Sequence, residues 1–116
     1  MNDVRKKKVE SLIQGILSRM ILTQEIKDPR VSSFLSVHAV TVSNDLSQAK
    51  AYISSFQKET TVEKAVEALN HASGFIQGLL MKRLSMRTVP RVLFFADDSI
   101  QKSMELNRII DEANRS

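Results

Sequence analysis

The chain has 116 residues, a formal net charge of +4 and 42% hydrophobic residues, which suits one domain with a core of its own. It contains no cysteine, which excludes a disulfide framework, a thiolate metal site and a thiol nucleophile. Because no apolar run is long enough for a signal peptide or a membrane span, we expect one cytoplasmic domain over residues 1–116, with flexible ends at 1–4 and 112–116.

The first predicted element is an amphipathic helix, whose apolar pattern begins at Val9. Its apolar residues keep the spacing i, i+3, i+4 as far as Ile21. Asp28 and Pro29 then form a turn signal, because proline cannot continue the helical hydrogen-bond ladder. We therefore expect the helix to end between residues 24 and 27.

Two strands are predicted next, over residues 34–43 and 48–56. In the first strand the apolar positions change from odd numbers (Leu35, Val37) to even numbers (Val40, Val42). A strand otherwise alternates strictly between its two faces, so this change predicts a β-bulge near residues 38–39. The segment SNDLS between the strands has turn chemistry, and the two strands are expected to form a hairpin.

One long helix is expected over residues 61–84, with a capping box at residues 60–63 and an interruption at Ala72, Ser73 and Gly74. A glycine inside a helix costs about 1 kcal/mol relative to alanine, and an unbroken helix of this length would span roughly 36 Å. We therefore expect a break near Gly74, where the unpaired first N–H groups of a second helix suit a phosphate. The alternative is that Gly74 only permits a bend or close packing on the sheet.

The last predicted strand covers residues 89–95, and residues 97–99 (DDS) are expected to begin a C-terminal helix. This order of elements implies a small sheet with helices on one face, which is an α+β fold. The other face, which carries His38, Lys50 and Tyr52, is either solvated or meets a partner.

Seven short segments together resemble the bacterial ribosome-binding factor A family, from about residue 4 to about residue 107. These segments are residues 25–30 (EIKDPR), 43–46 (SNDL), 49–52 (AKAY), 72–76 (ASGFI), 87–90 (RTVP), 93–95 (LFF) and 98–99 (DS). The resemblance implies a type II KH-like domain, α-β-β-α-(kink)-α-β, with a three-stranded mixed sheet. In that family an Ala-x-Gly kink, here Ala72, Ser73 and Gly74, replaces the usual Gly-x-x-Gly loop.

The resemblance also implies a function. It implies a nonenzymatic factor that binds the free small (30S) ribosomal subunit through its 16S rRNA and neighbouring ribosomal proteins. Such a factor assists maturation of the 5′ end of that RNA and supports growth in the cold. We expect no cofactor, no metal, no membrane contact and a monomeric state.

Basic residues gather in two runs without acids, which indicates a surface able to attract a polyanion. With the kink, these runs are expected to form one phosphate-contacting stripe. The candidate RNA-binding residues are Arg5, Lys6, Lys7, Lys8, Arg30, Ser73, Gly74, Lys82, Arg83, Arg87 and Arg91. The alternative is a protein interaction module that docks through the open sheet face or the C-terminal helix, its charges serving solubility alone.

Other residues favour structural roles. His38 and His71 lack a second metal ligand at helical spacing and are expected to be packed or surface histidines. Most of the five phenylalanines are expected in the core. A hydrolase or nuclease is disfavoured, because the chain shows neither a nucleophile beside an activating base nor a carboxylate metal cluster.

Overall fold

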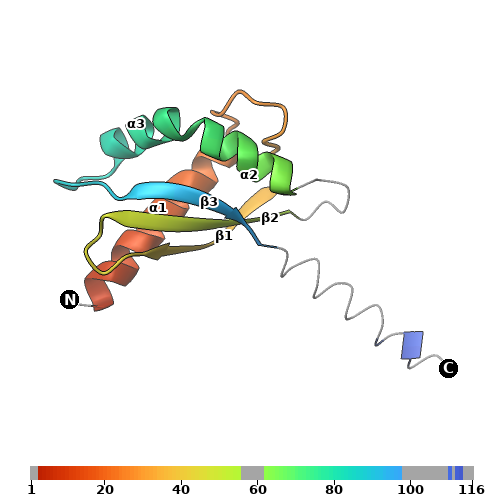
Figure 1. The fold of residues 1–116 in the computed structure, drawn as a ribbon, viewed down its shortest axis with the longest axis horizontal. Helices are drawn as coiled ribbons and strands as arrows, with labels where there is room; N and C mark the ends of the chain where they lie inside the picture. Colours follow the sequence, from red (N-terminus) through yellow and green to blue (C-terminus); the bar gives the residue numbers. More distant parts are fainter. Residues whose placement is uncertain (1–2, 56–61, 98–109, 111, 114–116) are drawn as a thin grey trace.

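The computed structural model describes residues 3–55, 62–97, 110 and 112–113. Its elements are α1 (Asp3–Leu22), β1 (Leu35–Val42), β2 (Gln48–Ser55), α2 (Val62–His71), α3 (Ser73–Arg83) and β3 (Arg91–Ala96). Figure 1 shows α1 lying behind the sheet, and α2 and α3 following one another along β3. The capping box at residues 60–63 and most of the expected C-terminal helix fall outside the described residues, although residues 110, 112 and 113 are helical.

Helix α1 differs from its prediction at both ends. It begins at Asp3, so two of the residues expected to be flexible are helical, and it stops at Leu22, before the predicted end. Gln24 has a φ of 55°, a left-handed conformation that ends a helix, and the Thr23 hydroxyl donates to the Arg19 carbonyl at 2.7 Å. The helix is therefore terminated by local backbone geometry, several residues ahead of Pro29.

The sheet has the strand order β1-β2-β3, with β1 antiparallel and β3 parallel to β2. The register shifts between Val37 and Ala39, which confirms the predicted bulge. In the hairpin turn Leu46 has a φ of 60°, and the carboxylate of Asp45 accepts hydrogen bonds from Ser43 and Ser47. The mixed three-stranded sheet confirms the expected α+β class.

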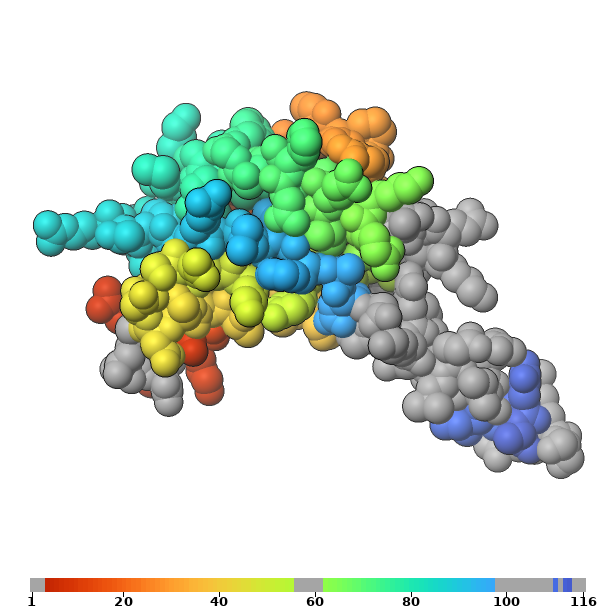
Figure 2. Space-filling view, viewed as in Figure 1, coloured from red at the N-terminus to blue at the C-terminus, as the bar shows by residue number. Residues whose placement is uncertain are grey.

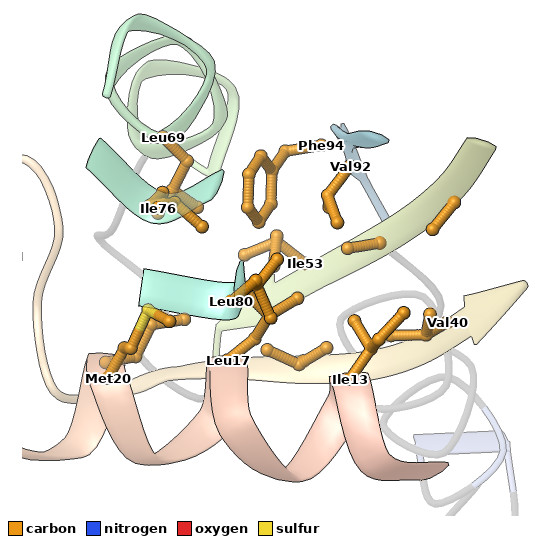
Figure 3. Packing of buried hydrophobic residues seen from close by; sticks show 14 of the residues in the cluster. Ile13, Leu17, Met20, Val40, Ile53, Leu69, Ile76, Leu80, Val92 and Phe94 are labelled. Carbon is orange, nitrogen blue, oxygen red and sulfur yellow. The ribbon is translucent and has the colours of Figure 1, made fainter. Parts of the chain in front are cut away.

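The core lies between the helices and one face of the sheet. Figure 3 shows side chains of α1 pointing toward side chains of α3 and the strands. Residues buried almost completely there are Ile13, Leu17, Met20, Ile53, Leu69, Ile76, Leu80 and Phe94. The alternation of β3 therefore sends Val92 and Phe94 inward and turns Arg91, Leu93 and Phe95 to the opposite face, which no described helix covers and which is called the helix-free face below.

Two side-chain amides occupy the outer edge of β3. Asn70 of α2 exchanges two hydrogen bonds with the backbone of Phe94, at 3.0 and 2.9 Å. Gln77 of α3 donates to the Pro90 carbonyl at 2.8 Å and accepts from the Val92 N–H at 3.3 Å. These bonds satisfy edge groups that would otherwise be free to pair with another strand, and they tie both helices to β3.

Candidate nucleic-acid interface

The expected break is present between α2 and α3, at Ala72. The Ala72 N–H donates to Ala68 and the Ile76 N–H donates to Ala72, both at 3.0 Å. Between them, the N–H groups of Ser73, Gly74 and Phe75 donate no backbone hydrogen bond to any residue that the structure describes. These donors stand at the positive end of the α3 dipole, which makes this turn suitable for an anion.

Nothing on α3 itself neutralises this end of the helix. The N-cap residue is Ala72, which makes no side-chain cap, and the first turn contains no acidic residue. Helices usually begin with Ser, Thr, Asp or Asn, because the side-chain oxygen of these residues accepts from a free N–H. The first turn of α3 therefore keeps donors that an external acceptor can use.

Gly74 has no positive φ, and a Cβ built on it meets no atom within 4 Å. Close packing on the sheet therefore does not account for the glycine, whereas the break between α2 and α3 that a weak helix former permits is a structural role for it. The missing side chain leaves the neighbouring N–H groups open to a close partner.

A hollow of about 310 Å³ lies beside the break. It is formed on one side by residues 25–28 and on the other by Ala68, His71, Ala72 and Phe75. The structure thus brings together the two segments that carry most of the family resemblance. Lys27, His71 and Phe75 are exposed around it, so a cation, an imidazole and an aromatic ring stand next to the free N–H groups.

Arg30 is held by acids of its own chain. Its guanidinium donates to both carboxylate oxygens of Asp28, at 3.1 and 2.9 Å, and lies 4.0 Å from Glu67. The side-chain and backbone hydrogen bonds from Arg30 lower the pKa of Asp28 from its ordinary 3.8 to about 2. Asp28 is therefore the turn former that the sequence predicts, and Arg30 completes the turn.

Arg83 is also paired within the molecule. Its two terminal nitrogens donate to the two carboxylate oxygens of Glu25, one of them at 3.1 Å. This hydrogen bonding lowers the pKa of Glu25 and raises that of Arg83. The pair fastens the last turn of α3 to the segment after α1, which gives Arg83 a structural role that its place in a basic run does not reveal.

A second hollow, of about 530 Å³, lies at the other end of the domain, where Figure 2 shows the start of α1, the β1–β2 turn and the α3–β3 connection gathered together. Arg5 of α1 and Arg87 of the connection both line it, next to Asp45. The ammonium of Lys6 donates to Asn44 at 3.3 Å, which attaches the start of α1 to the same turn. One arginine from each basic run therefore lies at this hollow.

One continuous stripe of candidate cations is not formed. Arg91 lies on the helix-free face of the sheet, away from Lys82 on α3, because strand alternation points it outward opposite Val92. Within the described part of the chain, several candidates form no ion pair. They are Arg5, Lys6, Lys7, Lys8, Lys82, Arg87 and Arg91.

The expectation that most phenylalanines are buried is wrong for three of the four that the structure describes. Phe34 and Phe75 are each 53% exposed and Phe95 is 40% exposed, whereas Phe94 is buried. The sequence does indicate that either Phe94 or Phe95 faces away from the core, because the two residues are adjacent in a strand and must point to opposite faces.

Among the described residues, no cluster of three His, Asp or Glu side chains is suited to a metal ion. None of the described helices is both long enough and apolar enough to cross a membrane.

Comparison with known proteins gives a consistent picture. The family model described as ribosome-binding factor A matches residues 5–110. A protein named ribosome-binding factor A from Borrelia garinii subsp. bavariensis is 42% identical over 112 residues, which cover 97% of this chain and 93% of that protein.

Solved structures agree with the sequence comparison. The crystal structure of ribosome-binding factor A from Thermus thermophilus has a TM-score of 0.65 at 33% identity, covering 78% of this chain and 94% of that one. A homology model of the Thermus thermophilus factor, fitted into a cryo-electron microscopy map of its 30S complex, has a TM-score of 0.55 at 31% identity. It covers 75% of this chain and 93% of that one.

Proposed function

Because the chain belongs to the ribosome-binding factor A family, we propose that it binds the free small ribosomal subunit, through 16S rRNA and neighbouring ribosomal proteins. It assists maturation of the 5′ end of that RNA and supports growth in the cold. Both roles are those that the family resemblance implies. The protein works in the cytoplasm, where subunits mature, and acts by binding alone.

The break between α2 and α3 is the observation that supports this function most directly. Free N–H groups of Ser73, Gly74 and Phe75 are the hydrogen-bond donors of a binding site for one phosphate of the RNA backbone. The hydroxyl of Ser73, a half-buried residue at the start of α3, adds a further donor. Two lysines supply positive charge. Lys27 lies at the hollow beside this turn, and Lys82 lies in the last turn of α3.

The basic end of the domain forms a second contact with RNA in this proposal. Arg5 and Arg87 line one hollow there, and Lys7 and Lys8 extend the charge along α1. Contacts of this kind position a protein on RNA without reading its sequence. Arg30 and Arg83 support the site from within, through Asp28 and Glu25, and Arg91 contributes on the other sheet face.

Sucrose-gradient fractionation of cell extracts tests the proposal. The protein is expected to travel with free small subunits and to be absent from the large-subunit fractions. If about six phosphates are neutralised, affinity for purified subunits falls about 10³-fold between 50 and 200 mM salt. Subunit binding that ignores salt would instead support a protein interaction module.

A further inference from the structure

The helix-free face of the sheet carries an aromatic pair between cations, in which Tyr52 is half-buried and Phe95 is exposed. Tyr52 of β2 and Phe95 of β3 are register partners, with ring centroids 5.9 Å apart and planes inclined by 32°. Phe95 is 40% exposed, and so is Leu93, which stands on the same face. Two residues of one strand thus expose large apolar groups where solvation alone would favour polar side chains.

The charge of this face has one sign along the strands. None of β1, β2 and β3 contains an aspartate or a glutamate, and their ionisable cations are His38, Lys50 and Arg91. The Lys50 ammonium lies 5.9 Å from the centroid of the Phe95 ring. Arg91 is paired in register with Gln48, two residues before Lys50. Asp45 stands in the hairpin turn and Asp97 directly after β3, at opposite ends of these strands.

The acid after β3 marks the limit of the exposed surface. The carboxylate of Asp97 lies 3.5 Å from His38, and its backbone carbonyl accepts a hydrogen bond from the buried Ser54 hydroxyl. The open part of the face therefore extends from the beginning of β2 to Tyr52. It covers β2 and β3. Arg91 lies at its beginning, and the ammonium of Lys50 lies over the ring of Phe95.

We propose that this face is a stacking platform for single-stranded RNA, a second nucleic-acid surface that deepens the function proposed above. Unpaired bases stack on Tyr52 and Phe95, and Lys50 and Arg91 contact the phosphates that join those bases. An aromatic surface beside positive charge suits single-stranded nucleic acid because every base has a flat face and every linkage carries a negative charge. A protein partner of matching charge would need acidic residues around an apolar centre.

The composition of the chain offers a direct test. Tyr52 is its only tyrosine and it has no tryptophan, so the intrinsic fluorescence of the protein reports this face alone. Titration with a short oligouridylate is expected to quench that fluorescence, since stacking of a base on tyrosine quenches it. N-acetyltyrosinamide, titrated in parallel, corrects for absorption by the RNA. Inorganic polyphosphate is expected to leave the corrected fluorescence unchanged, because it supplies charge without a base.

Two variants locate the contact. Phe95→Leu keeps an apolar side chain but removes the ring, and is expected to weaken oligouridylate binding at least about fivefold. Phe34→Leu removes another exposed ring, outside the sheet, and is expected to bind as the wild type does. Lys50→Gln is expected to lower the slope of log affinity against log salt by about 0.7, the value for one phosphate contact on a single strand.

Several outcomes would overturn the platform. They are wild-type fluorescence that oligouridylate does not quench, equal quenching by polyphosphate, and Phe95→Leu binding as tightly as wild type while circular dichroism shows it folded. A face that docks on a protein gives the first of these results. Co-sedimentation with small subunits is measured separately, so loss of the platform with retained subunit binding leaves the proposed function standing.

Discussion

Replacing Gly74 with alanine separates stability from binding, because the structure predicts opposite effects on the two. The added methyl group meets no atom within 4 Å, and the backbone at Gly74 is helical. Alanine should therefore stabilise the protein by about 0.5 kcal/mol, the lower end of the range for a helical glycine, since Gly74 lies in the first turn. At roughly 4 °C per kcal/mol for a domain of this size, Tm should rise by about 2 °C.

Binding to small subunits should weaken in the same variant. The methyl group adds bulk to the helix turn whose N–H groups are proposed to hold a phosphate, and a lost hydrogen bond to a charged group costs about 1.5–3 kcal/mol. Affinity should therefore fall at least about tenfold. Thermal unfolding by circular dichroism and co-sedimentation with purified small subunits measure the two effects on the same preparation.

Two other glycines serve as controls. Gly15 in α1 and Gly78 in α3 also leave open space for a Cβ, and both lie inside helices, so Gly15→Ala and Gly78→Ala should each stabilise the protein by about 1 kcal/mol. Neither should lose affinity, because each lies beyond the first turn of its helix. The reasoning fails if Gly74→Ala binds as the wild type does. It also fails if Gly78→Ala, on the same side of α3, is impaired equally, since the whole helix face would then be the contact.

Three further predictions concern the surroundings of the site. Asn70→Asp puts a carboxylate oxygen against the Phe94 carbonyl and should lower the free energy of unfolding by about 1–3 kcal/mol in urea titrations; an unchanged midpoint would show that the edge bonds contribute nothing. Because Arg83 is hydrogen-bonded to Glu25, Arg83→Gln should leave the salt dependence of subunit binding unchanged. Arg87→Gln should reduce the slope of log affinity against log salt by about 0.7 to 0.9. A reduced slope in Arg83→Gln and an unchanged slope in Arg87→Gln would assign the RNA contact to Arg83. The folded pKa of Asp28 is depressed from 3.8 to about 2, so its contribution to stability is present above pH 4 and is lost as pH falls toward 2; Asp28→Asn should flatten this part of the acid unfolding curve, and an unaltered curve would contradict the pairing with Arg30.

The sequence allowed prediction of those features that depend on local rules. The bulge in β1 follows from the change of parity between Val37 and Val40, and the break follows from weak helix formers at Ser73 and Gly74. The end of α1 was placed too late, because Pro29 is a visible signal whereas the left-handed conformation of Gln24 carries none. A helix end that is set by the backbone conformation of one residue, as at Gln24, leaves little trace in the amino-acid sequence.

The parts of the site that the sequence did not reveal depend on distant pairs. Arg83 and Glu25 are 58 positions apart, and only the packing of α3 across α1 brings their charges together. Charge runs alone could not distinguish such an internally paired arginine from a free one. The exposure of Phe75 is hidden for a related reason, since its position beside Ile76 fits an apolar helix face, and only the packing of the whole domain decides that Ile76 is buried and Phe75 is not.

The edge of β3 connects the two proposed RNA surfaces. Asn70 lies two residues before Ala72 and is bonded to Phe94, whose neighbour Phe95 belongs to the opposite face. Gln77, which follows the break, is likewise hydrogen-bonded to the backbone of Pro90 and Val92. These four bonds fix the broken helix against the strand that carries the aromatic ring, and they leave little of this edge free for strand addition by a partner. A single RNA strand that contacts both surfaces must therefore pass around β3, whereas two separate RNA segments of one subunit need not.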